Sequence, residues 1–442
     1  MPGQDYASAC GGVAESVTPG GSDPAMTVSA ARGEGGGPDG IAPRPPGGLA
    51  SRLDRPAVPG LIALLAAVAF VLARLHDWAN GHISRFILVG QRFATQAQLP
   101  HGIAVSPTYG YDGQFFYRLA LDPLNMRPTA YGITTDHSYR YMRIGYPALT
   151  WLVSLGQHVL VPVMLVVVNV AAIGALGWLG GVIARQAGRH ALAGLLLPAF
   201  FGIITSLSRD TAEPLAAACL VAGLLAVRAR RPVPAALLLV YGVLTRETVL
   251  VAVVAIAALR VIGLLRRQHP ARFGLDDLPW VLPTVAFFAW QVVVKAATGS
   301  FALLADSGRN AGTPFLAPLK ALGQNLAHFN AQRFDQVDLW FLQMAILTAF
   351  ALAALVCLRS TRVPIHERLA FVLFLVEICV VTPSTWNSLD SDLRSFIEVY
   401  LLAVIILLGT PRRAAGTWLL SSLAGFALPA LVVVTQRRLI GS

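Results

Sequence analysis

The sequence predicts an all-α integral membrane protein, and its composition and its hydropathy pattern are the two observations behind this prediction. Of the 442 residues, 55% are hydrophobic and only 13% are charged, whereas soluble domains carry roughly 25% charged residues. From Val58 onward, apolar runs of nearly membrane-spanning length recur along the chain. The net charge of +11 is that of many nucleic-acid-binding proteins. Here the arginines stand beside apolar runs, where they set membrane orientation, so we expect no nucleic-acid partner.

The first 56 residues differ from the rest of the chain. They are rich in Gly, Pro, Ala and Ser, and they contain the stretch GEGGGPDGIAPRPPGG without any apolar period. Such a segment buries too little apolar surface to offset its ordering entropy. No apolar core follows a basic start, so the segment is not a secretory signal. We predict a disordered cytoplasmic tail over residues 1–56 and a polytopic membrane domain over residues 57–442.

The apolar runs predict about eleven transmembrane helices. Several of these runs are short and require tilted or re-entrant helices. Two long polar segments interrupt them, at residues 76–145 and 298–338, and we predict these to be outer loops. The expected spans are residues 58–75, 158–184, 191–207, 211–227, 233–245, 248–265, 279–297, 339–358, 368–383, 395–409 and 416–435.

The charges predict the orientation of the helices. Residues 191–227, 233–265 and 368–409 each have the pattern of a helical hairpin with an arginine-rich base and a tip that carries both signs of charge. Because basic loops remain in the cytoplasm, the tips and both polar loops are expected to face outside. The charges thus predict a multi-pass plasma-membrane protein with a cytoplasmic N-terminus. Arg437 and Arg438 depart from this pattern and leave the side of the C-terminus open.

The sequence lacks the common motifs of metal and nucleotide sites. Cys10, Cys219, Cys357 and Cys379 have no paired spacing, which argues against a disulfide framework or a zinc site. There is no Walker-type loop and no HExxH motif. A phosphate group bound by this chain would therefore be held by arginines at the predicted outer face.

The first polar segment contains a candidate catalytic acid. In YGYDGQFFYRLALDP, Asp112 stands among aromatic residues and precedes Gly113, which permits backbone geometry that other residues resist. Phe116, Leu119 and Ala120 have helical spacing, which predicts a short interfacial helix lying on the membrane. An amphipathic anchor with an aromatic belt is the alternative to a functional site.

Arginines near the membrane edge are candidates for holding a phosphate. Arg140 and Arg143 are three residues apart and share one helix face, an arrangement that suits a lipid phosphate because guanidinium groups bind it in a bidentate manner. Ordinary headgroup contact or salt bridging is the alternative. At the hairpin tips, charged residues near the membrane are costly unless they pair or face a cavity. These tip residues are Arg209, Asp210, Glu213, Arg246 and Glu247.

The alternative for the tips is mutual pairing that stabilises the bundle without any chemistry. In the last tip, Arg394 and Glu398 are four residues apart and can pair along a helix. Trp386 in the same tip can stack on a sugar or lie in an interfacial belt.

Four of these motifs resemble a known class of enzymes. A first helix, a long outer loop with an Asp near the membrane and many helices with short connections resemble the GT-C glycosyltransferases, which use polyprenyl-phosphate sugars. The stretches YDGQFFYRLALDP, RYMRIGYPALTWL, SRDTAEPLAA and LTRET are similar to a bacterial group of GT-C-like proteins linked to cell-surface glycopolymers. The resemblance runs from about residue 58 to the last helices.

The resemblance implies roles for individual residues. Asp112 matches the first-loop acid and would act as general base in an inverting transfer from a lipid phosphate. The developing phosphate charge would be stabilised by Arg140, Arg143, Arg209, Arg246 or Arg394. Because the paired acidic motif of metal-using relatives is absent, we expect no metal and no cofactor. Residues expected to contact the acceptor or the sugar are Tyr111, Gln114, Asp210, Glu213, Glu247 and Trp386.

The sequence thus predicts a membrane glycosyltransferase that transfers a sugar from a polyprenyl-phosphate donor to an outer-face glycan or glycolipid, with membrane lipids as further partners. A transporter or flippase for a polyprenyl-linked or amphipathic substrate is the alternative. Transporters place their binding residues near the midplane and usually show internal repeats, whereas the charges here gather at one edge. A non-catalytic assembly subunit with the same fold is a third interpretation.

Overall fold

The computed structural model describes residues 49–266, 273–305, 313–329, 336–386 and 394–411. Within these ranges the chain is mostly helical, as predicted, and its few strands are two residues long. Most of the predicted tail and the predicted last span, 416–435, lie outside these ranges. The last residues of the predicted tail include a short helix, α1 (Leu49–Leu53).

Five helices among the described residues are long and apolar enough to cross a membrane. These five helices support the prediction of a membrane protein, but they do not account for all of the eleven predicted spans. The five segments correspond to α2 (Ala57–Asp77), α5 (Val161–Gln186), η5 with α9 (Glu247–Val249 and Leu250–Leu265), η6 with α10 (Leu275–Asp277 and Leu278–Thr298) and α13 (Gln336–Cys357).

Shorter helices fall where the remaining described spans were predicted. They are α7 (Glu213–Arg228), α8 (Pro232–Thr245), α14 (Ile365–Val380) and α17 (Ile397–Leu408). At about 1.5 Å per residue these helices are shorter than a bilayer core. The predicted span 191–207 is wrong as a continuous helix, because it is divided into η4 (Ala191–Leu196) and α6 (Phe201–Ser208). Pro198 lies in the break, and proline disrupts the hydrogen bonding of a helix interior.

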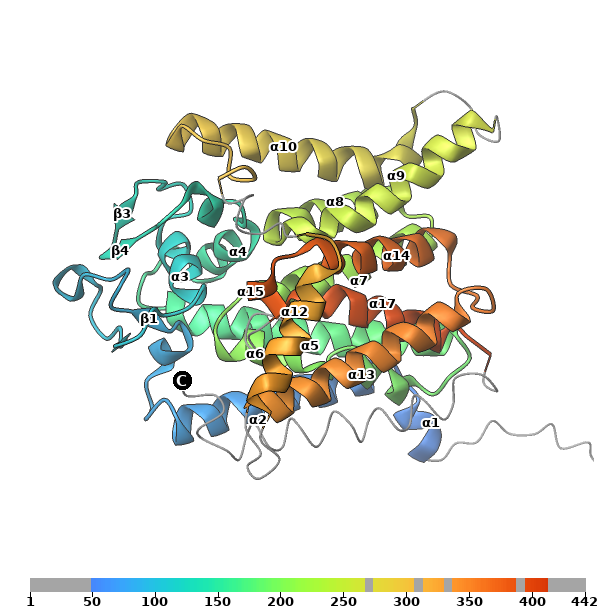
Figure 1. The fold of residues 1–442 in the computed structure, drawn as a ribbon, viewed down its shortest axis with the longest axis horizontal. Helices are drawn as coiled ribbons and strands as arrows, with labels where there is room; N and C mark the ends of the chain where they lie inside the picture. Colours follow the sequence, from blue (N-terminus) through green and yellow to red (C-terminus); the bar gives the residue numbers. More distant parts are fainter. Residues whose placement is uncertain (1–48, 267–272, 306–312, 330–335, 387–393, 412–442) are drawn as a thin grey trace, which may run out of the picture. The chain divides into compact units, whose positions relative to one another are not determined.

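Close helix packing begins with α2 and α5, which lie side by side (Figure 1). A Cβ atom on Gly177 of α5 would lie 2.8 Å from the Cβ of Ala63 on α2. Only a residue without a side chain permits this approach of two helices. Further packed pairs are α7 with α8, α8 with α10, α9 with α14, and α13 with α17.

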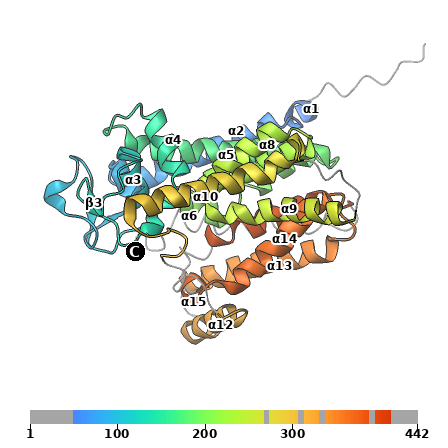
Figure 2. The ribbon, with the colours of Figure 1, turned by 90° about the horizontal axis from the view of Figure 1, so that it is seen from above.

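The first polar segment folds against one end of these helices, as Figures 1 and 2 both show. It contains η1 (Ile83–Phe86), η2 (Gln96–Gln98), α3 (Gly113–Leu121), η3 (Ser138–Tyr141) and the start of α4 (Gly145–Val153). The parallel pair β1 (Val89–Gly90) and β2 (Val105–Ser106) and the antiparallel pair β3 (Thr129–Ala130) and β4 (Ile133–Thr134) complete it.

Helix α3 corrects the prediction of an interfacial helix. All nine of its residues are buried inside the protein, so α3 presents no free face to a membrane. It packs against α4 and α5, with the Phe116 ring edge-on to Tyr146 at a centroid distance of 5.6 Å. The second predicted outer loop is likewise partly helical, because α12 (Leu316–His328) lies within it. The short helix α15 (Pro383–Trp386) follows α14.

The opposite ends of the hairpins also meet. Arg228 at the end of α7 forms a bidentate ion pair with the buried Glu367 near the start of α14. Arg189 donates hydrogen bonds to backbone carbonyls at the end of α17, including that of Leu408 at 2.8 Å. The bases of different hairpins therefore lie together, and their tips gather at the other end.

Candidate functional site

Asp112 lies immediately before α3, and its carboxylate binds two arginines from distant parts of the chain. One oxygen accepts a hydrogen bond from Arg140 Nη1 at 2.6 Å, and the other accepts one from Arg394 Nη2 at 2.5 Å. The side chain does not cap α3. About a fifth of it is exposed, at 20%. Asp112 thus joins the first polar segment to the last hairpin tip.

Gly113 is required next to Asp112 because the backbone is crowded there. A Cβ atom on Gly113 would lie 2.7 Å from the carbonyl oxygen of Ile87 and would also overlap the carbonyl oxygen of Arg209. The position of this glycine beside Asp112 suggested unusual backbone geometry. The structure instead shows the close approach of three segments, which fixes where Asp112 stands relative to the α6–α7 turn.

Arg140 and Arg143 both bind carboxylates, and they do not share a helix face as expected, because η3 ends at Tyr141 and α4 begins only at Gly145. Arg140 also donates to Asp136 through Nε at 2.9 Å, and its guanidinium lies 4.1 Å from the centroid of the Phe115 ring. Arg143 forms a bidentate pair with Glu247, at 2.8 and 2.5 Å. The stretch between the start of η3 and the start of α4 therefore carries two arginines that bind different acids.

Glu213 is the buried centre of the cluster. Its side chain is 1% exposed, and one carboxylate oxygen lies 3.3 Å from Arg394, 3.8 Å from Arg246 and 4.0 Å from Arg143. Three guanidinium groups from three separate segments thus surround one carboxylate. Because removal of water strengthens such interactions, Glu213 fixes the relative positions of the hairpin tips.

Arg394 and Glu398 do not form the intrahelical pair that their spacing suggested. Arg394 binds Asp112 and Glu213, while Glu398 accepts a hydrogen bond from Thr248 at 2.7 Å and lies 3.5 Å from Arg246. Contacts between tips therefore replace the contact along the helix. The cluster contains the acids Asp112, Asp136, Glu213, Glu247 and Glu398 and the arginines Arg140, Arg143, Arg246 and Arg394.

The electrostatics of the cluster favour charged side chains. Burial opposes ionisation of Asp112, but the Arg394, Arg140 and Arg143 charges outweigh it and hold the pKa of this carboxyl well below its usual range. The neighbouring carboxylates in turn raise the pKa of the Arg140 guanidinium against the effect of burial. Asp112 therefore stays ionised, and a carboxylate with so low a pKa is a weak base while both arginines are bound to it.

Tyr111 lies between two arginines. The Arg209 guanidinium is 4.9 Å from its ring centroid, and the Arg394 guanidinium is 4.8 Å from it. Both distances are those of cation–π contacts. Arg209 follows α6, so Tyr111 connects the α6–α7 turn to the arginine that binds Asp112.

Three further residues that were expected to contact the acceptor or the sugar are Gln114, Asp210 and Trp386. Gln114 is buried, and its amide holds the loop by accepting from the backbone N–H of Gly90 and donating to the carbonyl of Tyr109. Asp210 is fully buried, and neither of its carboxylate oxygens has a hydrogen-bond partner among the described residues. Trp386 donates to the carbonyl of Ile378 and packs 4.5 Å from the Phe396 ring.

Sequence reasoning missed Tyr139 as a part of the cluster. Its hydroxyl accepts from Arg143 at 2.6 Å and donates to Glu247 at 3.2 Å. Burial raises the pKa of Tyr139, so the hydroxyl keeps its proton. The signal was present in SYRYMR, because Tyr139 and Arg143 are four residues apart and can share a helix face.

The cavity beside Asp112 is small. It has a volume of about 10 Å³, room for about one water molecule. Its lining consists of Asp112, Phe115, Phe116, Tyr139, Arg140 and Arg143. Among the residues that the structure describes, no group of three or more His, Cys, Asp or Glu side chains is arranged to hold a metal ion.

No protein-family model, no curated protein and no solved structure matches this chain. The likeness to the GT-C glycosyltransferases therefore rests on the sequence motifs alone. What the geometry adds is that residues from all four motifs meet in one cluster.

Proposed function

We propose that the chain is a membrane glycosyltransferase of the GT-C type, with Asp112 as the general base. The observation that carries the proposal is the position of Asp112, a partly exposed carboxylate bound by one arginine of the first polar segment and one arginine of the last hairpin tip. The tips gather at the end of the helices where the first polar segment folds, which supports a site at one membrane edge. We propose that this edge is the outer face of a bacterial plasma membrane.

In the proposed reaction, Asp112 accepts the proton of an acceptor hydroxyl as that oxygen attacks the anomeric carbon of the sugar. The bond between this carbon and the phosphate oxygen of the donor breaks, and the lipid phosphate leaves with the electron pair. Attack from the face opposite the leaving group inverts the configuration. Guanidinium groups stabilise the negative charge that develops on the phosphate.

The ion pairs of Asp112 set a condition on this reaction. While Arg140 and Arg394 both bind the carboxylate, it is a weak base, and the adjacent cavity is too small for a sugar. An anionic substrate that draws one of these arginines away would raise the basicity of Asp112 and widen the cavity in the same step. We propose that substrate binding activates the base in this way.

The proposal is tested with the purified full chain in lipid nanodiscs, supplied with labelled polyprenyl-phosphate sugars and glycan or glycolipid acceptors. The Asp112→Asn variant should lose at least about 100-fold in transfer rate, the usual contribution of a general base. Asp122→Asn, at the other end of α3, is the matched control and should retain activity.

Transfer at the normal rate by Asp112→Asn would remove the catalytic assignment. The alternative of a transporter or flippase is tested in the same preparation after reconstitution into vesicles. Movement of the labelled lipid across the bilayer, with no sugar transferred to any acceptor, would favour that alternative over an enzyme.

A further inference from the structure

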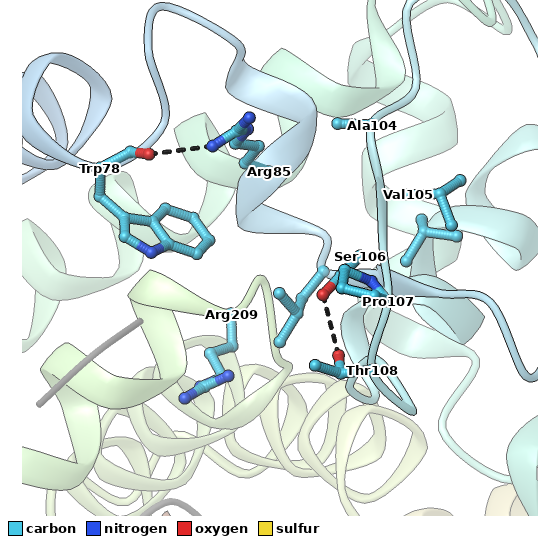
Figure 3. Close-up of a pocket in the computed structure, with 10 residues that line it drawn as sticks. Trp78, Arg85, Ala104, Val105, Ser106, Pro107, Thr108 and Arg209 are labelled. Carbon is cyan, nitrogen blue, oxygen red and sulfur yellow. Dashed lines mark hydrogen bonds between the residues drawn. The ribbon is translucent and has the colours of Figure 1, made fainter. Parts of the chain in front are cut away.

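The surroundings of the chain change from apolar to polar where α2 ends. This helix is long enough to cross a membrane and ends at Asp77, and the chain beyond it lines a pocket of about 230 Å³ (Figure 3). Polar side chains at the pocket include those of Arg85, Ser106 and Thr108, together with Arg209 from the α6–α7 turn. Such groups are costly inside hydrocarbon. The membrane edge therefore lies near the end of α2, on the side where the hairpin tips gather.

Helix α12 lies at this same end of the helices. The backbone N–H of Phe315, just before α12, donates to the carbonyl oxygen of Cys379 at the tip end of α14, at 2.8 Å. Helix α12 also packs against α15, which follows α14. It runs crosswise to α5 and α10 (Figure 1) and stands at the periphery of the bundle (Figure 2). A helix crosswise to the spanning helices runs along the plane of the membrane.

Helix α12 is too short to cross a bilayer. Its 13 residues extend about 20 Å at about 1.5 Å per residue, whereas the hydrocarbon core is about 30 Å thick. A short helix at a membrane edge is covered by protein on every face, stands in water, or lies along the lipid surface. The exposure of its side chains distinguishes these three arrangements.

The surface of α12 is divided into three rows of side chains. The row that packs on the protein is buried and consists of Ala317, Ala321 and Asn325. The apolar row is exposed and consists of Leu316, Leu319, Leu322 and Leu326. The polar row is exposed and consists of Lys320, Gln324 and His328. With about 3.6 residues per turn, the apolar and polar rows lie on roughly opposite sides of the helix, and the buried row lies between them.

These rows fit a boundary between lipid and water. Leu319 and Leu326 are 65% and 57% exposed, which is unfavourable for leucines in water. Phe315 before the helix and Phe329 after it are also exposed, at 64% and 49%. Residues 313–329 include Lys320 but no Asp or Glu, a composition that suits the phosphate groups of lipid headgroups. A helix that stood in water would leave the leucine row without a partner.

We propose that α12 is an interfacial helix that lies in the headgroup region of a phospholipid bilayer, at the membrane edge where the Asp112 cluster stands. Its leucine row faces the acyl chains, its polar row faces water, and its buried row holds it to α14 and α15. The second polar segment is thereby anchored to the membrane surface. This inference needs only a membrane protein and does not depend on the proposed enzymatic activity.

The test places nitroxide spin labels on the full chain in phospholipid nanodiscs, one label in each variant. Leu319→Cys and Leu326→Cys label the apolar row, and Gln324→Cys and His328→Cys are the matched controls on the polar row. Collisions with oxygen, which concentrates among acyl chains, are compared with collisions with a water-soluble nickel complex. The ratio should be several-fold higher for the apolar row, and these labels should lie about 5–10 Å below the headgroup boundary.

Two further variants complete the design. Cys10 and Cys379 are first replaced by Ala, whereas Cys219 and Cys357 are buried and stay in place. Leu65→Cys, near the middle of α2 at a leucine that is 58% exposed, is the reference for a label in the hydrocarbon core. Labels on the apolar row of α12 should lie at a shallower depth than this reference.

Three results would overturn the proposal. Equal access of the nickel complex to both rows would show that the leucines face water. A depth equal to that of the Leu65 label would place α12 in the hydrocarbon core and not at its boundary. Spin–spin broadening of the Leu319 label that disappears on dilution with unlabelled chain would show that a second copy of the chain covers the leucine row.

Discussion

Replacing Glu213 by Gln tests whether one buried charge holds the hairpin tips together. The change keeps the shape of the side chain and removes its negative charge. At about 4 Å and an effective dielectric constant of about 20, each guanidinium–carboxylate pair has a Coulomb energy of about 4 kcal/mol. Glu213 lies within 4.0 Å of three arginines, and its side chain is 1% exposed. The cost of desolvating these groups offsets much of that sum.

Removing one partner of a buried ion pair usually costs about 3–5 kcal/mol, because the other charge remains buried without compensation. We expect Glu213→Gln to lower the free energy of unfolding by at least this amount, since three arginines lose the same partner. The measurement is the unfolding of the full chain in mixed micelles with increasing denaturing detergent, followed by circular dichroism.

Asp136→Asn is the matched control for Glu213→Gln. Asp136 pairs with Arg140 nearer the surface, and its side chain is 23% exposed. Solvent screening limits the contribution of such a pair to about 1 kcal/mol or less. If both variants changed the unfolding free energy by the same small amount, Glu213 would not be the centre of the cluster and the electrostatic argument would be refuted.

Two further predictions use the same unfolding measurement. Gly113→Ala should cost about 1–3 kcal/mol, because the new methyl group meets backbone oxygens that cannot move aside, whereas Gly323→Ala, with open space around it in α12, should cost nothing. The second concerns pH: the folded-state pKa of Asp112 lies below its unfolded value of about 4, so its stabilising contribution is complete above pH ~4 and is lost as the pH falls further. The stability difference between wild type and Asp112→Asn should therefore shrink between pH 7 and pH 3, and a constant difference would contradict this.

Local patterns in the sequence located most of the helices. Hydropathy runs predicted segments within a few residues of α2, α5, α8, α10 and α13, because a continuous apolar stretch of that length has few alternatives to a helix. The pattern failed at 191–207, where an uninterrupted apolar run contains Pro198. Hydropathy averaging does not register the backbone hydrogen bond that proline removes.

The sequence also singled out most of the residues that form the charged cluster. Asp112, Arg140, Arg143, Glu213, Arg246, Glu247 and Arg394 were singled out as charges near apolar spans, and the structure brings them together. The sequence did not show which of these residues form ion pairs with one another. Arg394 lies 282 positions from Asp112 and 181 from Glu213, and a spacing rule along one helix paired it with Glu398 instead.

Tertiary structure alone decided how the charges pair and which surfaces remain for a ligand. Sequence periodicity describes one element at a time, whereas ion pairing depends on which ends of which helices meet. The amphipathic spacing of 113–121 predicted a helix correctly but placed it on the membrane, because the pattern cannot show that neighbouring segments cover every face of α3.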